Sequence, residues 1–358
     1  MDIQERINLI KKVGEEILTE DELKTLLETK KTPIAYDGFE PSGRIHIAQG
    51  ILRALNINRM TKAGCKFKML VADWHGWANN KMGGDLEKIQ TVGKYFIEVW
   101  KVAGIDNDNV EFVWCSDFCS DDEYWKKVLQ IGRNTTLQRI IRTTQIMGRS
   151  EKDTLSAAQI IYPCMQCADI FHLNIDIAQL GMDQRKVNIL ARELGPKLGL
   201  WKPIAVHHHM LMGLIPPPKE TVKDTTERTI ALKMSKSNPD SAIFMDDTEE
   251  EIKRKISKAY CPQNIIEENP IMEYAKYLLF DNIKEFIVKR DKKYGGDLTF
   301  TKFEDLAKTY SVGGLHPTDL KNTVAEELNK LIEPVRKHFE KPAPKKLLEQ
   351  VKSFSVTR

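Results

Sequence analysis

The beginning of the chain alternates apolar and polar positions with the period of a helix. Apolar residues recur there every three or four positions, at Ile3, Ile7, Ile10, Val13 and Ile17. This spacing predicts an amphipathic helix. Thr19, followed three positions later by Glu22, is typical of a capping box and predicts that a second short helix starts there.

After this start the pattern changes to short β-rich runs separated by longer helical stretches. The pattern predicts strands at residues 33–36, 67–72 and 110–114 and helices at residues 49–62 and 85–102. Further strands are expected at 174–178 and 203–207. Strands that alternate with helices in this way predict an α/β fold with a Rossmann-like parallel sheet. Ligands gather at the carboxyl ends of such strands, where we expect Tyr36, Asp73 and the turn at 181–184.

Beyond Asp246 we expect no more strands. Helical patterns continue there, with breaks at Pro262, Pro270, Gly295 and Pro317. The sequence therefore predicts a Rossmann-like domain over residues 1–245 and a mainly helical domain over residues 246–358. The Pro-rich and polar stretch between them predicts a mobile loop over about 221–241.

Composition and charge narrow the classes of protein only slightly. The chain has 358 residues, 41% hydrophobic and 29% charged, with a formal net charge of +3, which suits a globular protein. Residues 331–358 carry 7 Lys/Arg against 3 Asp/Glu, a local +4 that is compatible with phosphate contact. No apolar run is long enough to span a membrane, and the acidic start lacks a signal layout, so we expect a cytoplasmic protein.

Six cysteines are too sparse for a disulfide scaffold. Cys115 with Cys119, and Cys164 with Cys167, have the spacing of zinc half-sites, but buried reduced thiols are the favoured interpretation. The consecutive His207, His208 and His209 end a strand, so alternate side chains point to opposite faces and cannot all bind one ion. We expect no metal site in the protein.

Two separated segments predict a nucleotide site. One is Pro41-Ser42-Gly43-Arg44-Ile45-His46-Ile47-Ala48-Gln49, and the other is Lys233-Met234-Ser235-Lys236-Ser237. A Gly-containing turn that opens a helix offers N–H groups to an anion, and a Ser/Lys loop can add ammonium groups. Each segment alone also has a structural interpretation, as a helix start and as a solvated lysine loop. The chain has neither a P-loop nor a dinucleotide fingerprint.

A third segment predicts a wall that binds a polar ligand. Tyr162, Gln166 and Asp169 are spaced i, i+4 and i+7 and share one helix face. Apolar residues surround that face, so a solvent-facing polar stripe is the weaker alternative. A buried phenol, amide and carboxylate are costly unless they bind a polar partner.

The two nucleotide segments resemble the signature motifs of class I aminoacyl-tRNA synthetases, K-M-S-K-S and a variant of H-I-G-H. Ala48 stands where Gly is usual and Gln49 where the second His is usual, so we give His46 more weight than Gln49. Residues 35–43, 162–169 and 181–186 further resemble tyrosyl-tRNA synthetases of the archaeal and eukaryotic type. The resemblance covers about residues 33–350.

The resemblance implies roles for particular residues. Catalysis falls to His46, Lys233 and Lys236. The substrate phenol is held by Tyr36 and Asp169, and the substrate ammonium by Tyr162, Gln166 and Gln184. The ATP site comprises Ser42, Gly43, His46, Gln49, Asp183, Lys233, Ser235, Lys236 and Ser237.

Segments 293–297 and 316–322 resemble the anticodon-binding elements of the same family. Tyr294 can stack on a base and Asp319 can accept from guanine, with His316 beside them. The alternative is that His316 caps a helix and Tyr294 packs in a loop. Arg139 and Arg185 match positions near the acceptor end of tRNA.

The resemblance implies an enzyme that activates L-tyrosine with ATP to tyrosyl-adenylate and transfers it to tRNA(Tyr). It also implies Mg²⁺ bound with the nucleotide, and a homodimer. We weigh three alternatives: a tryptophanyl-tRNA synthetase, a catalytically idle RNA-binding relative, and an adenylating enzyme with a different acceptor.

Overall fold

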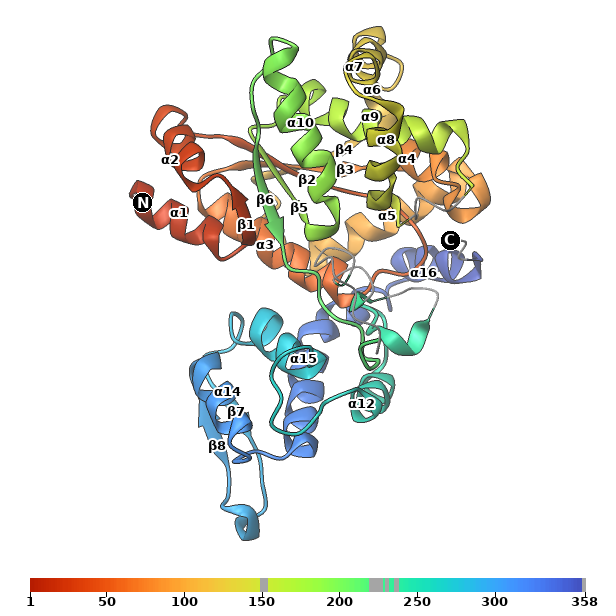
Figure 1. Cartoon of the computed structure of the whole chain (residues 1–358). Coiled ribbons are helices and arrows are strands. Elements are labelled where there is room, and N and C mark those ends of the chain that lie inside the picture. Colours follow the sequence, from red (N-terminus) through yellow and green to blue (C-terminus); the bar gives the residue numbers. More distant parts are fainter. Residues whose placement is uncertain (149–153, 219–227, 229–231, 235–237, 356–358) are drawn as a thin grey trace.

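A six-stranded sheet forms the centre of the upper part of the molecule (Figure 1). The computed structural model describes residues 1–148, 154–218, 228, 232–234 and 238–355. Strand order is β1-β6-β5-β2-β3-β4, with β1 antiparallel to β6 and the other pairs parallel. The strands are β1 Gly14–Leu18, β2 Ile34–Phe39, β3 Lys66–Val71, β4 Val110–Trp114, β5 Ile177–Gly181 and β6 Ile204–His208.

Helices cover both faces of this sheet because the strands are apolar on both sides. Ala35 and Met69 belong to one buried apolar cluster, whereas their neighbours Tyr36 and Leu70 belong to a second. The first cluster includes α1 Ile3–Lys11, α2 Glu20–Thr29, α3 Arg53–Lys62 and α5 Leu86–Val102. The second includes α7 Asp122–Arg133, α8 Leu137–Thr143, α9 Ala157–His172 and α10 Arg185–Lys197. Two short helices, α4 Asp73–Ala78 and α6 Cys115–Phe118, follow β3 and β4.

The strand order reverses beside β2. From β2 the chain crosses to β3 and β4 on one side, whereas β5 and β6 lie on the other side. In an open α/β sheet, this reversal leaves a crevice outside the carboxyl ends of the two strands. The loops after β2 and β5 therefore converge at one place.

The part of the chain after residue 246 lies below the sheet and is mostly helical (Figure 1). Its helices are α12 Glu249–Lys258, α13 Pro270–Tyr274, α14 Phe303–Ser311, α15 Pro317–His338 and α16 Pro342–Ser353. Contrary to the prediction that strands stop at 246, β7 Phe286–Val288 and β8 Leu298–Phe300 form an antiparallel hairpin. The final helix, α16, returns to the upper part and packs against α5. The division into domains 1–245 and 246–358 stays a prediction.

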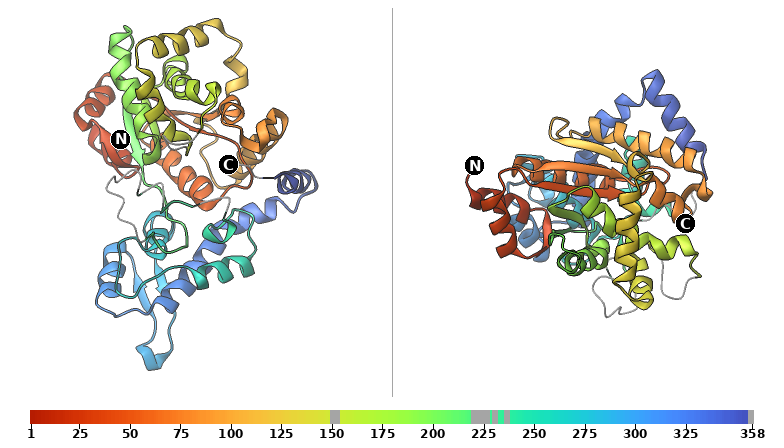
Figure 2. Two further views of the ribbon diagram at one scale, coloured as in Figure 1. Left: turned by 45° about the vertical axis from the view of Figure 1, so that its right-hand side comes forward. Right: turned by 90° about the horizontal axis from the view of Figure 1, so that it is seen from above.

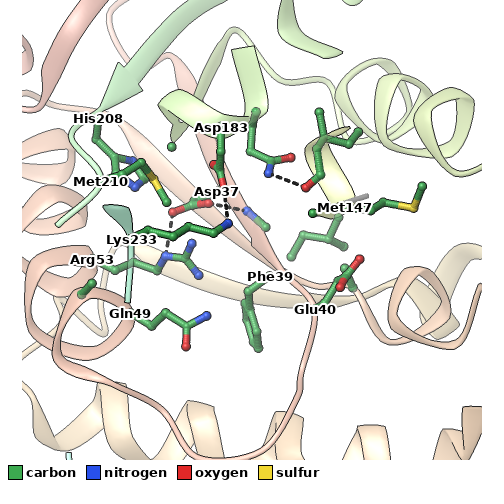
Figure 3. A pocket seen from close by; sticks show the side chains of 18 of the residues that line it. Asp37, Phe39, Glu40, Gln49, Arg53, Met147, Asp183, His208, Met210 and Lys233 are labelled. Atoms are coloured by element: carbon green, nitrogen blue, oxygen red, sulfur yellow. Dashed lines mark hydrogen bonds and ion pairs between the residues drawn. The ribbon is translucent and has the colours of Figure 1, made fainter. Parts of the chain in front are cut away.

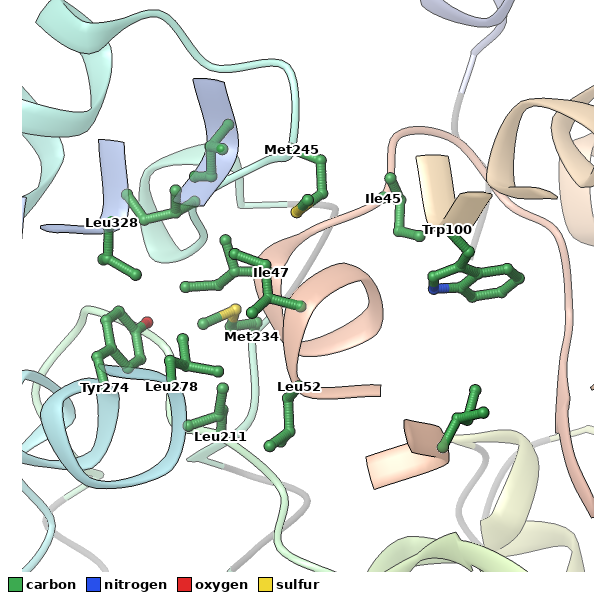
Figure 4. Packing of buried hydrophobic residues seen from close by; sticks show 14 of the residues in the cluster. Ile45, Ile47, Leu52, Trp100, Leu211, Met234, Met245, Tyr274, Leu278 and Leu328 are labelled. Atoms are coloured by element: carbon green, nitrogen blue, oxygen red, sulfur yellow. The ribbon is translucent and has the colours of Figure 1, made fainter. Parts of the chain in front are cut away.

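The two parts share one apolar cluster at their junction. Figure 4 shows Ile47 and Leu211 from the sheet side among Tyr274, Leu278 and Leu328 from the helical side. All five side chains are almost fully buried. The helical part therefore completes the core beneath the segment that carries His46.

A buried carboxylate fixes the same junction electrostatically. Asp247 is fully buried and accepts from Lys255 Nζ at 2.6 Å and from Arg44 at 2.9 Å, and it also accepts from the backbone N–H of Phe244 at 2.9 Å. Lys255 is on α12, whereas Arg44 is two residues before His46. The cluster thus ties the H-I-G-H-like segment to α12.

Apart from the hairpin of β7 and β8, the differences from the predicted elements lie near the start of the chain and at three element ends. The capping box of Thr19 and Glu22 is confirmed, as is the helix over 86–102. The first helix ends at Lys11, so placing Ile17 on it was wrong: Ile17 belongs to β1, which pairs with β6. β2 extends to Phe39, so Tyr36 lies inside the strand rather than at its end.

Two further boundaries were also misplaced. The strand expected from residue 174 begins at Ile177, because Asn174 adopts a left-handed conformation with φ of 56°. His46 lies just before the helix expected to contain it, and its carbonyl accepts the N–H groups of Gln49 and Gly50. Within the described residues, no helix has the length and apolar character needed to cross a membrane.

Substituting Lys255 tests the buried ion-pair cluster. Lys255→Met leaves the Asp247 carboxylate with one cation fewer in a buried site, so the free energy of unfolding should fall by about 3 kcal/mol. Urea denaturation measures the change. Lys253→Met on the same helix removes an exposed lysine paired only with Glu249, and it should change stability by less than about 0.5 kcal/mol. Equal effects of the two substitutions would contradict the assigned role.

Candidate active site

A cavity of about 280 Å³ opens at the strand-order reversal (Figure 3). Its lining comes from the ends of β2, β5 and β6, from the start of the helix after His46, from α9, and from Lys233 and Met234. These segments are distant in sequence, and the sheet topology brings them together.

The α9 wall predicted from the sequence is present. Tyr162, Gln166 and Asp169 are buried on one face of α9 and line the cavity. Gln166 Nε2 donates to Gln184 Oε1 at 3.0 Å, and Gln184 Nε2 donates to the carbonyl of Ile146 at 2.9 Å. This chain of bonds fixes both amides, and the Gln166 amide oxygen has no hydrogen-bond partner among the described residues.

Tyr36 faces the cavity from β2. Its side chain is buried, and its pKa is raised well above the usual value by burial first and then by the negative charge of Asp169 and Asp37. The phenol therefore stays protonated and can donate a hydrogen bond.

Two ion pairs occupy the region between β2, β5 and the helix after His46 (Figure 3). Asp37 lies 2.9 Å from Arg53, and Asp183 accepts from Lys233 Nζ at 3.0 Å. Burial raises the pKa of Asp37 to about 6 even though Arg53 favours the charged form. For Asp183, burial acts in the same direction, but Lys233 outweighs it and lowers the pKa.

All but one of the predicted nucleotide residues that the structure describes line this cavity. Ser42, His46, Gln49, Asp183 and Lys233 all line it. Gly43 does not line it but has φ of 56°, a left-handed turn that explains why glycine stands there. Ser235, Lys236 and Ser237, like most of the loop predicted over 221–241, lie outside the described residues.

Sequence reasoning missed several charged side chains at the site. Asp37 and Arg53 could have been found, because Asp37 follows Tyr36 at the end of an apolar strand and Arg53 is one helical turn after Gln49. His75 on α4 and Tyr124 on α7 touch Asp169. They carry no local signal, since only the tertiary fold brings them to α9.

The three consecutive histidines have three different surroundings. His207 contacts Glu16 at 2.8 Å and Asn188 at 3.0 Å, and His208 contacts Gln179 at 2.6 Å. His209 stacks on Tyr277 with ring centroids 4.3 Å apart. The side chains therefore diverge as the strand geometry predicts.

The cysteines of the suggested zinc half-sites are buried thiols. Cys115, Cys119, Cys164 and Cys167 are free and buried, and burial raises the pKa of each. They lie on α9 and around α6. Across the described ranges, no group of three or more His, Cys, Asp or Glu side chains is arranged to hold a metal ion.

The residues assigned to tRNA lie away from the cavity or at its outer wall. Tyr294 is 65% exposed between β7 and β8, and Asp319 lies in the first turn of α15. His316 caps that helix by accepting from the N–H of Thr318 at 3.2 Å, as the structural alternative predicted. Arg139 pairs with Glu193 at 2.6 Å, and Arg185 with Glu16 at 2.8 Å.

Comparison with known proteins agrees with this fold and site. The family described as tRNA synthetases class I (W and Y) matches residues 28–333, so the chain belongs to that family of aminoacyl-tRNA synthetases. A cytoplasmic tyrosine–tRNA ligase of Arabidopsis thaliana is 52% identical over all of this chain and 90% of its own length. A tyrosine–tRNA ligase of Thermococcus sibiricus is 46% identical over the full length of both chains.

A solved structure gives the same result in three dimensions. The tyrosyl-tRNA synthetase of Pyrococcus horikoshii, crystallised with L-tyrosine, superimposes with a TM-score of 0.91 at 43% identity, covering 98% of this chain and all of that one. The α/β class I fold predicted from the sequence is therefore confirmed.

The environment of His209 predicts how stability depends on pH. Burial opposes its protonation, but Glu15 from β1 and Glu273 from α13 outweigh burial and raise the pKa to about 9. Tyr277 and Lys276 complete the surroundings. Because the pKa of His209 is higher in the folded state than in the unfolded state, protonation of His209 stabilises the folded state. This contribution is complete below the unfolded pKa of about 6.5 and is lost as the pH rises through about 9.

Urea denaturation of the wild type and His209→Gln at about pH 6 and about pH 9.5 tests this dependence. Between the two values, the wild type should lose up to about 3 kcal/mol more than the variant. Parallel losses in both proteins would show that His209 is not charged in the folded state.

Proposed function

We propose that this chain acts as a tyrosine–tRNA ligase through the cavity described above. The carboxylate of L-tyrosine attacks the α-phosphate of ATP, forming tyrosyl-adenylate and releasing pyrophosphate. A hydroxyl of the terminal adenosine of tRNA(Tyr) then takes the tyrosyl group and releases AMP. The observation that carries the proposal is the buried pair of Tyr36 and Asp169 at a cavity that is also lined by His46 from one nucleotide segment and Lys233 from the other.

Tyr36 and Asp169 are assigned to the phenol of the substrate. The Tyr36 hydroxyl keeps its proton and can donate, while the Asp169 carboxylate can accept, so the two together match a group that both donates and accepts. A ring without a hydroxyl would leave these buried groups unpaired, which costs binding free energy.

Tyr162, Gln166 and Gln184 are assigned to the ammonium end. They offer oxygen acceptors on the opposite part of the α9 wall, and the open amide oxygen of Gln166 supports this assignment. The bond from Gln166 to Gln184 holds the acceptors in place before the substrate arrives. The assignment orients the substrate carboxylate toward the nucleotide segments.

The nucleotide is assigned to the side of the cavity with His46 and Lys233. His46 and Gln49 would donate to phosphate oxygens, beside Ser42 and the turn at Gly43. Asp183 would accept from ribose. Lys233 and Lys236, with Ser235 and Ser237 shaping their loop, would stabilise charge that grows on the pyrophosphate. Catalysis of this step then rests on alignment and electrostatics rather than on a covalent intermediate.

Mg²⁺ is proposed to enter with the nucleotide. The described residues provide no metal-holding cluster, so the phosphates of ATP and water would supply most of its ligands. The ion would neutralise phosphate charge during the attack.

The part after residue 246 is proposed to be the anticodon-binding domain. Tyr294 is exposed enough to stack on an unpaired base, and Asp319 is partly exposed in the first turn of α15. Arg139 and Arg185 would approach the acceptor end, where phosphates could replace their present carboxylate partners. His316 would act by fixing the start of α15.

A homodimer and a cytoplasmic location are further parts of the proposal. Leu129 on α7 and Leu137 on α8 are 67% and 59% exposed, and apolar side chains of this size suit a surface that a second copy covers. The cytoplasmic relative from Arabidopsis supports the location.

The alternatives are less well supported. The family also includes synthetases for tryptophan. An indole N–H only donates, however, and would leave the Tyr36 hydroxyl without an acceptor. An idle RNA-binding relative would not need a complete cavity. An adenylating enzyme with another acceptor would not need the exposed Tyr294 or the partly exposed Asp319.

Pyrophosphate exchange with ATP in the absence of tRNA tests the first step. Tyrosine should support exchange, and tryptophan and phenylalanine should not, because only tyrosine satisfies both Tyr36 and Asp169. Exchange with tryptophan would overturn the roles of these two residues. If no amino acid supports exchange, the idle RNA-binding alternative becomes the better one.

Point substitutions test the tRNA step better than truncation, since residues after 246 complete the shared core. Tyr294→Ala and Asp319→Ala should each lower kcat/KM for tRNA charging by about tenfold, and tyrosine-dependent exchange should stay unchanged. Thr299→Ala, at an exposed position on β8, serves as the control. If charging survives both substitutions, the anticodon assignment is wrong.

A further inference from the structure

The Asp169 carboxylate is held from behind by two side chains that are absent from the roles above. It is fully buried on α9. The Tyr124 hydroxyl, from α7, donates to Oδ1 at 3.0 Å. His75 Nε2, from α4, lies 3.0 Å from Oδ2. The two oxygens of one carboxylate are thus contacted by two different helices.

A buried carboxylate needs such neighbours to stay ionised. Removing an unpaired carboxylate from water costs several kcal/mol, and it would bind a proton instead. Burial opposes a charge on His75, yet the facing Asp169 raises the pKa of the imidazole, with help from Glu40 and Asp73. The Asp169 carboxylate therefore favours the charged form of the imidazole.

The neighbours also restrict the direction of the carboxylate. Tyr124 is fully buried against Phe118 and Trp125, with ring centroids 5.1 Å and 5.5 Å away, so its hydroxyl cannot follow a rotating carboxylate. His75 packs edge-on against Tyr162 with centroids 5.0 Å apart. Its contact with Oδ2 is close but lacks hydrogen-bond geometry, which leaves Oδ2 able to accept a further proton donor.

We propose that Tyr124 and His75 are positioning residues for substrate specificity: they hold the Asp169 carboxylate in the direction in which its Oδ2 accepts the hydroxyl of the bound phenol. This inference rests on the proposed function. The discrimination between tyrosine and phenylalanine then depends on residues that do not touch the substrate hydroxyl. Without Tyr124 or His75 the carboxylate turns away from the cavity, and the advantage of the hydroxyl shrinks.

Tyr124→Phe tests the inference with a change of one oxygen atom. In tyrosine-dependent pyrophosphate exchange, KM for tyrosine should rise by about tenfold, because a hydrogen bond to a charged group is lost. The kcat should stay within about twofold of the wild type, because the phosphate side of the cavity is untouched. The preference for tyrosine over phenylalanine should fall by about the same tenfold factor.

Tyr95→Phe is the matched control. Tyr95 is equally buried, on α5, but it packs against Phe96 and Phe339 and does not line the cavity. The control should leave both KM and the tyrosine preference unchanged. A general effect of removing a buried hydroxyl would appear in both variants and would overturn the inference.

His75 provides a second and independent test. His75→Leu removes the polar imidazole that contacts Oδ2 and should reduce the tyrosine preference more than Tyr124→Phe does. His75→Gln restores an N–H and should recover part of the preference. If the two His75 variants bind tyrosine with unchanged KM and preference, the inference is wrong even though wild-type exchange is intact. Absence of exchange in the wild type would instead contradict the proposed function itself.

Discussion

Two buried carboxylates and one partly buried carboxylate surround one cavity at the carboxyl edge of the sheet, and each is accompanied by a basic side chain. The pairs are Asp37 with Arg53 at 2.9 Å, Asp183 with Lys233 at 3.0 Å, and Asp169 with His75 at 3.0 Å. Single buried charges would either take up or lose protons or would draw water into the cavity. Pairing lets the cavity keep strongly charged side chains while the apolar clusters pack around it. The cations come from α3, α4 and the segment around Lys233, so those elements must reach the same edge.

Because these elements must reach the same edge, the strand order of the sheet matters more for the cavity than any single helix or strand does. The reversal beside β2 places the loops after β2 and β5 together, and β6 then leads the chain along the cavity wall toward α13. His209 lies at this junction: it lines the cavity, and it also contacts Glu273 and Tyr277 in the helical part. Figure 2 shows the helical part after residue 246 on the side of the sheet to which β6 leads the chain.

Much of this arrangement could be predicted from the sequence, for local reasons. The face of Tyr162, Gln166 and Asp169 follows from helical periodicity, and the helix over 86–102 from its apolar stripe. The errors arose where local patterns are ambiguous: Ile17 fits the spacing of the first helix, but pairing with β6 draws it into a strand. The contacts of Tyr124 and His75 with Asp169 could not be predicted at all, because these two residues precede Asp169 by 45 and 94 positions in the sequence.

The apolar cluster beneath His46 has a consequence for the whole chain. Because Ile47 and Leu211 pack with Leu278 and Leu328 in one core, neither side can lose its packing while the other keeps its own. Unfolding should then be cooperative across the sheet and the helices. A harmful substitution at Leu328, far along α15, would lower the number of molecules with an intact cavity rather than the rate of each molecule. In a cell its effect would be seen first as lower protein abundance.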